Sequence, residues 1–108
     1  MLTDYCAVDD LKGKVLQEIP ADDEAFDDEL GECITVGNAL ADAFLKREGL
    51  TVPVVVPEFV KFAAAYFAAW EFRRRRDPNA AEIYWNAAVN NYLQVYIDGE
   101  KTPYVGGV

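Results

Sequence analysis

The sequence predicts an all-α protein, a small bundle of about four helices with a short extended, proline-rich link and a flexible C-terminal tail. Apolar residues recur every three to four positions over long stretches, which is the period of an α-helix. Hydrophobic residues make up 52% of the 108 residues, which is enough for the core of one domain. We expect a helical domain over residues 1–98 and a tail over residues 99–108.

Two helices are expected in the first half of the chain. Residues 8–17 place apolar side chains at helical spacing, and Pro20 follows them. A longer amphipathic helix is expected from an N-cap at Asp22 to a left-handed glycine cap at Gly49. Its predicted buried face alternates steps of four and three residues: Phe26, Leu30, Cys33, Gly37, Leu40 and Phe44.

Two more helices are expected in the second half, after the link of residues 50–57. Residues 57–76 are apolar nearly all round, which predicts a central helix with neighbours on most sides. Asp77 and Pro78 are suited to cap and begin the last helix, which ends near Gly99. Its predicted core face is Ala80, Ile83, Tyr84, Ala87, Ala88, Asn91, Tyr92 and Val95. Trp85, Leu93 and Tyr96 fall outside that face, which makes Trp85 and Tyr96 candidates for a partner surface.

The charge distribution argues against a nucleic-acid-binding protein. The net charge is −9, with 13 acids and 4 bases in residues 1–50 and six of each in residues 51–108. A protein that binds by neutralising phosphates would carry an excess of Lys and Arg on its binding face. We therefore do not expect general nucleic-acid binding by this protein.

The residues needed for common catalytic and metal sites are missing from the sequence. It has no histidine, and its two cysteines, Cys6 and Cys33, are not in a Cys-x-x-Cys motif, so Cys33 is best explained as a small buried apolar residue. The acidic stretch of residues 22–32 has Asp27 where a calcium loop needs glycine. We predict no enzyme activity, cofactor or metal, and we expect neither a membrane span nor a secretion signal.

Four consecutive arginines, Arg73, Arg74, Arg75 and Arg76, precede the Asp-Pro pair. At the end of a helix they complement its exposed carbonyl groups. Successive helical residues are about 100° apart, so at least one arginine must face a neighbour. That neighbour is either the acidic half of the same chain or another subunit.

The acidic stretch and the tail are further candidates for contact surfaces. Asp23, Asp27, Asp28 and Glu32 are expected on one acidic helix face, either as a solvated surface, as an adaptation to high salt, or as a binding surface. The tail is either a frayed end or an arm that orders on a partner, with Tyr104 and Val105 as its anchors.

The order of motifs resembles the head-tail connector, or adaptor, proteins of tailed bacteriophages and archaeal tailed viruses. The matching segments are YCAVDDLKGKV, ALADAFL, VPVVVPEFV and EFRRRRDP, within residues 5–97. The resemblance implies a homo-oligomeric ring, usually twelvefold, that sits beneath the portal protein, contacts other neck or tail-completion proteins and lets genomic DNA pass through its lumen. It also implies a place in the neck of the virion, after assembly in the host cytoplasm.

In such a ring, the acidic face of the second helix would contact the arginines of the next subunit, with Trp85 and Tyr96 beside them. The alternative is an acidic regulatory or inhibitor module, similar to an antitoxin or a DNA mimic. That module would use the carboxylates of residues 22–32 to bind a basic partner protein and would need no ring.

Overall fold

The computed structural model describes residues 4–51 and 55–101, and these ranges form a helical bundle without a β-strand. The helices are α1 (Asp27–Arg47), α2 (Glu58–Arg74) and a long C-terminal helix in three successive segments. Those segments are α3 (Pro78–Asn86), the π-helical η2 (Ala87–Leu93) and α4 (Gln94–Lys101). Before α1, the chain makes a 3-10 turn, η1 (Val8–Asp10), and several further turns. The predicted all-α class is confirmed.

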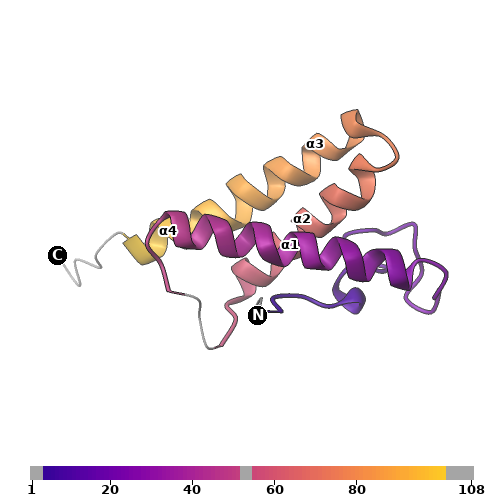
Figure 1. Ribbon diagram of the computed structural model, residues 1–108, viewed down its shortest axis with the longest axis horizontal. Helices are drawn as coiled ribbons and strands as arrows, with labels where there is room; N and C mark the ends of the chain where they lie inside the picture. The colour runs from indigo at the N-terminus through magenta and orange to yellow at the C-terminus, as the bar shows by residue number, and fades with distance from the viewer. Residues whose placement is uncertain (1–3, 52–54, 102–108) are drawn as a thin grey trace.

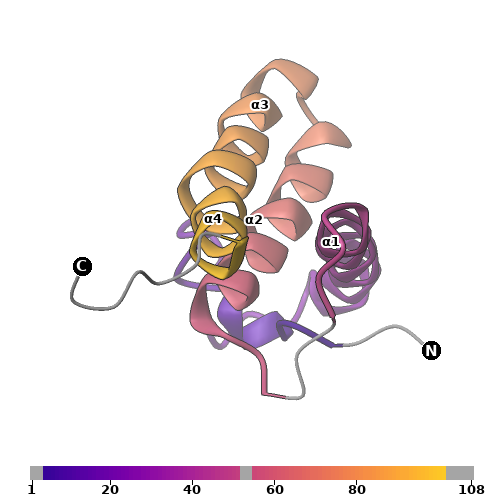
Figure 2. The same cartoon turned by 90° about the vertical axis from the view of Figure 1, so that its left-hand side faces the viewer.

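Helix α2 is the centre of the bundle, as the apolar composition of residues 57–76 predicts. Figure 1 shows α1 crossing in front of α2, and the end-on view of Figure 2 shows α2 between α1 and the C-terminal helix. The N-terminal segment covers the remaining side of α2 (Figure 2). The fully buried residues of α2 are mostly small, which lets its neighbours approach closely. They are Val60, Ala63, Ala64, Ala65, Phe67, Ala68 and Ala69.

The backbones of α1 and α2 touch at Gly37. A Cβ atom on Gly37 would lie 2.5 Å from the carbonyl oxygen of Ala64 and 2.9 Å from the amide nitrogen of Ala68. No real Cβ atom tolerates such distances, and both obstructing atoms belong to the backbone. Glycine is therefore required at this position so that the two helices can pack at this spacing.

The end of α1 confirms the predicted glycine cap. Gly49 has φ of +74°, and its amide donates to the carbonyl of Lys46 at 3.0 Å. The amide of Leu50 donates to the carbonyl of Leu45 at 2.9 Å, which completes a Schellman motif. The end of this helix follows from local sequence because glycine has no steric penalty at positive φ.

The helix predicted over residues 8–17 is wrong. Only η1 forms, because Gly13 adopts φ of +70° and its amide donates to the carbonyl of Ile19 at 2.7 Å instead of continuing a helix. Leu11, Leu16 and Ile19 are nevertheless buried. The apolar spacing in this stretch therefore serves a turned segment packed on the bundle, and not a helix of its own.

The start of α1 also differs from the prediction, because the helix begins at Asp27 and Asp22 does not cap it. The buried ammonium group of Lys12 binds the carbonyl oxygen of Asp23 at 2.9 Å and the carboxylate of Asp27 at 2.8 Å. A helix starting at Asp22 would use that carbonyl for its own hydrogen bond. The amide of Asp27 instead donates to the carbonyl of Glu24, so the contact with Lys12 replaces the first helical turn.

A second polar contact holds the N-terminal segment on α1. Asn38 is buried, and its side-chain oxygen accepts a hydrogen bond from the backbone amide of Tyr5 at 3.1 Å. The hydroxyl of Tyr5 donates to the carboxylate of Asp42 at 3.2 Å, and Asp42 also pairs with Lys46 at 3.0 Å. Hydrogen bonds to buried polar groups fix the position of this segment, because an unpaired partner would be costly.

The core face of the C-terminal helix differs from the predicted face. Ala81, Ala88, Leu93 and Ile97 are buried, whereas Ile83 is 70% exposed. The step of five between Ala88 and Leu93 falls within the π-helical segment, which adds a residue to the turn and rotates the following residues. A continuous α-helical period places Asn91 and Val95 on the core face, and both are exposed. The prediction is also wrong before the π-helical segment, since Ala80 and Ile83 are exposed and Ala81 is buried instead.

The corner between α2 and α3 largely confirms the prediction. The carboxylate of Asp77 accepts a hydrogen bond from the amide of Asn79 at 3.1 Å, and Pro78 is the first residue of α3. Helix α2 ends at Arg74, so Arg75 and Arg76 lie just beyond the helix and not in its last turn.

Gly37→Ala is expected to destabilise the protein by about 1–3 kcal/mol, because the added methyl group must push α1 and α2 apart. Urea denaturation followed by circular dichroism measures the change. The matched control is Gly31→Ala in the same helix, where an added Cβ meets nothing within 4 Å. This control should stabilise the protein by about 0.5–1 kcal/mol. Equal free energies of unfolding for the two variants would contradict the close approach at Gly37.

Candidate functional site

The described residues contain no cluster of three or more Cys, Asp or Glu side chains that could hold a metal ion. The two thiols are buried, and burial raises the pKa of Cys6 to about 12 and that of Cys33 to about 11. Both thiols stay protonated at neutral pH, which makes them poor nucleophiles. The expectation that Cys33 is a small buried apolar residue is confirmed. Neither a metal-binding cluster nor an activated thiol is therefore found among the described residues.

The four arginines and the acidic groups that pair with them form the arginine corner. Arg73 pairs with Glu18, and Arg74 with Glu71 at 2.6 Å. Arg75 binds Glu71, Glu29 and Glu32 at 3.0, 3.3 and 3.2 Å, and Arg76 binds Glu29 at 2.6 Å. Each arginine thus contacts a carboxylate of its own chain. Of the two predicted types of neighbour, the structure shows the acidic half of the same chain.

Glu71 is the buried centre of the arginine corner. It is 5% exposed, and its carboxylate accepts hydrogen bonds from Arg74 at 2.6–2.9 Å and from Arg75 at 3.0 Å. Burial alone raises the pKa of Glu71, but the hydrogen bonds from the two arginines hold it below its ordinary value of 4.5. A buried carboxylate that stays charged depends on these partners, so Arg74 and Arg75 have a structural role.

Arg76 also stabilises the corner through its contacts with aromatic rings. Its guanidinium lies 3.8 Å from the ring centre of Phe72 and 5.7 Å from that of Phe26, which are distances for cation–π interaction. Phe26 and Phe72 contact each other edge to face at 5.7 Å. Together with the pair between Arg76 and Glu29, these contacts attach the start of α1 to the end of α2.

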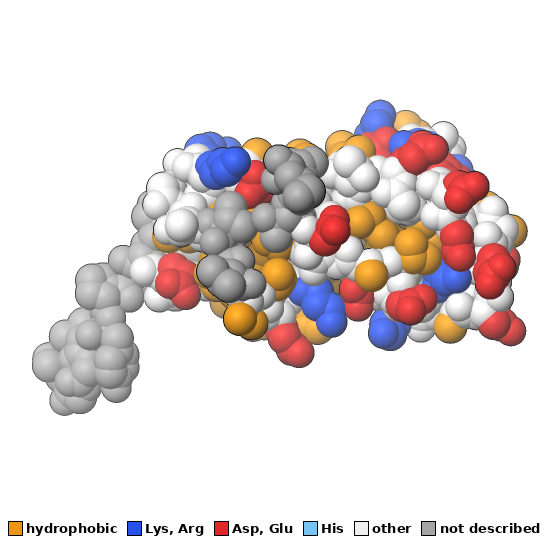
Figure 3. All heavy atoms as spheres, turned by 60° about the horizontal axis from the view of Figure 1, so that its bottom comes forward, with side chains coloured by type: hydrophobic (Ala, Val, Ile, Leu, Met, Phe, Trp, Pro, Cys, Tyr) orange, Lys and Arg blue, Asp and Glu red, His pale blue; other side chains and the backbone are white. Residues whose placement is uncertain are grey.

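The carboxylates of the predicted acidic face have different surroundings. Asp27 pairs with Lys12, Glu32 pairs with Arg75, and the carboxylate of Asp23 accepts a hydrogen bond from the amide of Ala25 at 2.9 Å. Asp28 is exposed and has no ion pair in the described part of the chain. In Figure 3, acidic side chains gather at the end of the molecule that holds the start of α1. Much of the charge of the candidate residues is therefore balanced within the chain.

The prediction that Trp85 and Tyr96 lie off the core is wrong. Both are half-buried and pack against the core. The indole ring of Trp85 lies 5.1 Å from Phe67, 4.8 Å from Trp70 and 6.1 Å from Phe44. The π-helical segment brings Leu93 into the core as well, because it changes which residues face α2. Tyr104 and Val105 lie outside the described residues.

A row of aromatic rings lies partly exposed between α2 and the C-terminal helix. Its rings touch in succession, with centre distances of 6.2 Å from Tyr84 to Tyr66, 5.1 Å from Tyr66 to Tyr92 and 5.5 Å from Tyr92 to Phe62. Phe59 also contacts Tyr92, at 6.2 Å. Phe59 is 43% exposed and Phe62 36%. We call Tyr84, Tyr66, Tyr92, Phe62 and Phe59 the aromatic row.

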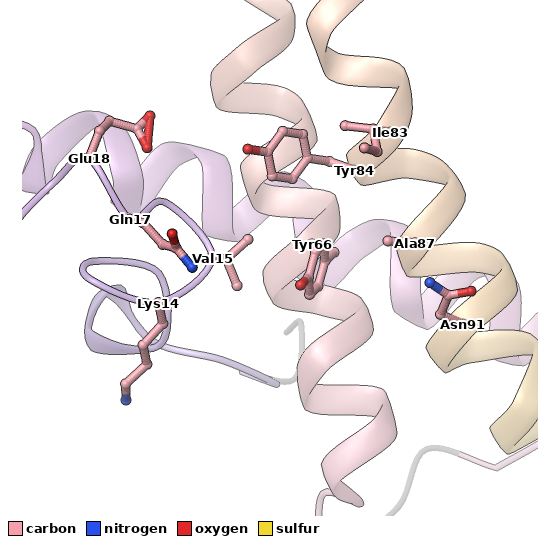
Figure 4. Close-up of a pocket in the computed structure, with 9 residues that line it drawn as sticks. All are labelled: Lys14, Val15, Gln17, Glu18, Tyr66, Ile83, Tyr84, Ala87 and Asn91. Atoms are coloured by element: carbon pink, nitrogen blue, oxygen red, sulfur yellow. The ribbon is translucent and has the colours of Figure 1, made fainter.

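A groove follows the aromatic row. One hollow of about 530 Å³ and a second of about 300 Å³ share Lys14, Val15 and Tyr66 in their walls. Figure 4 shows the larger hollow, with the N-terminal segment on one side, the ring of Tyr66 in the middle and the C-terminal helix on the other side. We call this continuous hollow the tyrosine groove. The larger hollow is lined by Lys14, Val15, Gln17, Glu18, Tyr66, Ile83, Tyr84, Ala87 and Asn91, and the smaller by Asp10, Lys14, Val15, Lys61, Phe62, Tyr66 and Tyr92.

The walls of the groove carry side chains that can form hydrogen bonds. Burial, and then a hydrogen bond with Tyr92, raise the pKa of Tyr66 above its ordinary value of 10.0. The side chains of Asn91 and Gln17 add amide donors and acceptors to the walls. A groove whose walls combine apolar side chains with neutral and charged polar groups can bind a partner segment.

The sequence did not point to the groove because its walls come from three separate segments. Helical periodicity assigns each tyrosine to a face of its own helix, and it predicts a helix where the N-terminal segment is turned. The one signal in the sequence is the number of large side chains on the two facing helices, with Tyr66 on one and Ile83, Tyr84 and Tyr92 on the other.

Comparisons with protein-family models, with curated proteins and with solved structures found no match for this chain. None of the described helices has both the length and the apolar character that crossing a membrane requires. The functional interpretation therefore rests on the surfaces described above.

Glu71→Gln is expected to destabilise the protein by about 1–3 kcal/mol, because a neutral amide leaves two arginines without their shared buried partner. Urea denaturation at pH 7 measures this loss. Glu32→Gln is the matched control, since Glu32 is 67% exposed and its pair with Arg75 should contribute about 0–1 kcal/mol. An equal loss in the two variants would contradict the central role of Glu71.

The stability of the protein should fall in acid, below the ordinary glutamate pKa of 4.5. Hydrogen bonds from Arg76 lower the pKa of Glu29, and the arginines also lower that of Glu71. A lowered pKa stabilises the folded state above pH 4.5, and this contribution is lost as the pH falls through the lower folded-state values. Melting temperatures measured between pH 7 and pH 3 should fall less steeply below pH 4.5 in Glu29→Gln than in the wild type. Parallel curves would contradict the assignment.

Proposed function

We propose that the protein is a structural subunit of the head-tail connector of a tailed virus. In this proposal, copies of the chain form a ring, usually twelvefold in similar proteins, beneath the portal protein. The ring joins the capsid to other neck or tail-completion proteins, and the genome passes through its lumen. The protein acts by assembly in the neck of the virion and not by catalysis.

The observation that carries the proposal is the aromatic row with the exposed aliphatic side chains next to it. Ile83 is 70% exposed beside Tyr84, and Val95 is 46% exposed one helical turn after Tyr92. Aromatic side chains are enriched in protein interfaces, and a run of exposed apolar groups usually marks a docking surface. The order of sequence motifs, which resembles that of connector proteins, supports this assignment from a separate direction.

The arginine corner is engaged within one chain, so we place the main subunit contact on the aromatic row. A closed ring requires two different complementary surfaces on each subunit. The sequence predicts that the acidic face of one subunit pairs with the arginines of the next. In the structure, arginines of the corner instead pair with Glu29 of α1 in the same chain. Charge reversal of the arginines would therefore damage the fold before it tested an interface.

The acidic charge fits a channel through which DNA passes. The net charge is −9, and several exposed carboxylates, including those of Asp22, Glu24 and Asp28, have no ion pair among the described residues. A negative wall repels phosphate and keeps DNA from sticking. The alternative of an acidic inhibitor module has less support, since Asp23, Asp27 and Glu32 bind groups of their own chain.

The double variant Phe59→Asp, Val95→Asp should fold but fail to form a ring with the portal protein. It places one charge on the aromatic row and one on the exposed aliphatic side chain next to it. Electron microscopy of the protein mixed with the portal encoded beside its gene measures assembly, and circular dichroism checks folding. Ala43→Asp, Ala80→Asp adds the same charge at two exposed helical sites and should assemble normally. Absence of a complex between the wild-type protein and the portal, or normal rings with the double variant, would overturn the proposal.

A further inference from the structure

We propose that the tyrosine groove binds residues 102–108 of a neighbouring copy of the chain. This inference rests on the proposed assembly into a ring and adds to it the segment that occupies the groove. The sequence of the segment is TPYVGGV, and Tyr104 and Val105 are adjacent apolar side chains near its middle.

The dimensions of the groove fit a short extended segment. Tyr84 and Tyr92 mark its two ends on the C-terminal helix and are eight positions apart, or about 12 Å at 1.5 Å per residue. An extended chain covers about 3.3 Å per residue, so about four residues fill that length. Residues 103–106 provide one proline, one tyrosine, one valine and one glycine for this stretch.

The chemistry of the groove matches that of the segment. Aromatic grooves commonly bind proline-containing segments in extended conformations, whose backbone groups are free to form hydrogen bonds. Here the hydroxyl groups of Tyr66 and Tyr84 and the amides of Gln17 and Asn91 can bind that backbone. Apolar contacts for Tyr104 and Val105 are available from the other side chains of the walls, such as Val15, Ile83, Ala87 and Phe62.

The charges of the groove also fit this occupant. The charged residues of its walls are two acids and two bases, Asp10, Glu18, Lys14 and Lys61. Asp10 pairs with Lys61 at 3.4 Å, and Glu18 pairs with Arg73. Residues 102–108 carry no charged side chain. A segment without charged side chains avoids the cost of burying an unpaired charged side chain in the groove.

Residues 102–108 of the same copy are too short to line the whole groove, although they are long enough to reach its end at Tyr92, nine positions before Lys101. Helix α4 ends at Lys101, seventeen positions beyond Tyr84, which corresponds to about 26 Å along the helix axis. Seven residues at full extension reach about 23–25 Å, and here they would also have to reverse direction. A neighbouring copy has no such limit, and a segment of one subunit in a groove of the next is a head-to-tail contact of the kind a ring needs.

A peptide of residues 99–108, GEKTPYVGGV, tests the inference as the ligand. The receptor is the full-length chain with the substitution Tyr104→Asp, so that its own residues 102–108 do not compete with the peptide. We expect saturable 1:1 binding by NMR titration, with shifts at Tyr66, Tyr84 and Asn91. Ile83→Asp in the receptor should weaken binding at least tenfold, since Ile83 lines the groove and is exposed. Ala43→Asp is the matched control, at an exposed site of α1, and should leave the affinity unchanged.

A control peptide carries the same ten residues in scrambled order. The inference would be overturned by absence of saturable binding at millimolar peptide, by equal affinity for the scrambled peptide, or by binding that Ile83→Asp does not weaken. Full-length Tyr104→Asp gives a second readout in the portal assembly. If that variant forms normal rings, the inference is overturned and the proposed function stands. If the peptide binds as expected but the wild-type chain forms no complex with the portal, the groove assignment stands and the connector proposal is overturned.

Discussion

The arrangement of this protein depends on the close contact between α1 and α2 at Gly37. The backbone atoms of Ala64 and Ala68 lie where a side chain on residue 37 would stand, so the two helices pack in close backbone contact there. Because the helices are antiparallel, this contact brings the start of α1 beside the end of α2. Glu29 can then reach Arg75 and Arg76, and Phe26 can reach Phe72.

The arginine corner shows how a cluster of like charges is accommodated at the end of a helix. Four adjacent guanidinium groups repel one another, and the chain balances them with Glu71 below the surface and with Glu18, Glu29 and Glu32 around it. The acidic partners come from the N-terminal segment and from α1, so the corner ties three parts of the chain together. The run of four arginines resembles an interaction motif in the sequence, but in the structure its ion pairs stabilise the fold.

The surface that is left for binding adjoins the arginine corner, because Glu18 and Tyr84 line the tyrosine groove and also contact Arg73. The N-terminal segment is held by Lys12 and Tyr5, and it forms one wall of the tyrosine groove. The π-helical segment turns Leu93 and Ile97 into the core and leaves Tyr92 against Tyr66. A π-helical turn is often found at functional positions, and here it shapes the wall of the proposed docking surface.

The sequence by itself determined the features that depend on neighbouring residues. These are the helical class, the apolar α2, the glycine cap at Gly49 and the Asp-Pro start of α3, since helical period and capping act over a few positions. Tertiary contacts decided the rest. Lys12 displaced the first turn of α1, and η2 shifted the buried face after Ala88. The partners of the arginines and the tyrosine groove also depend on segments distant in sequence, whose contacts exist only after the chain has folded.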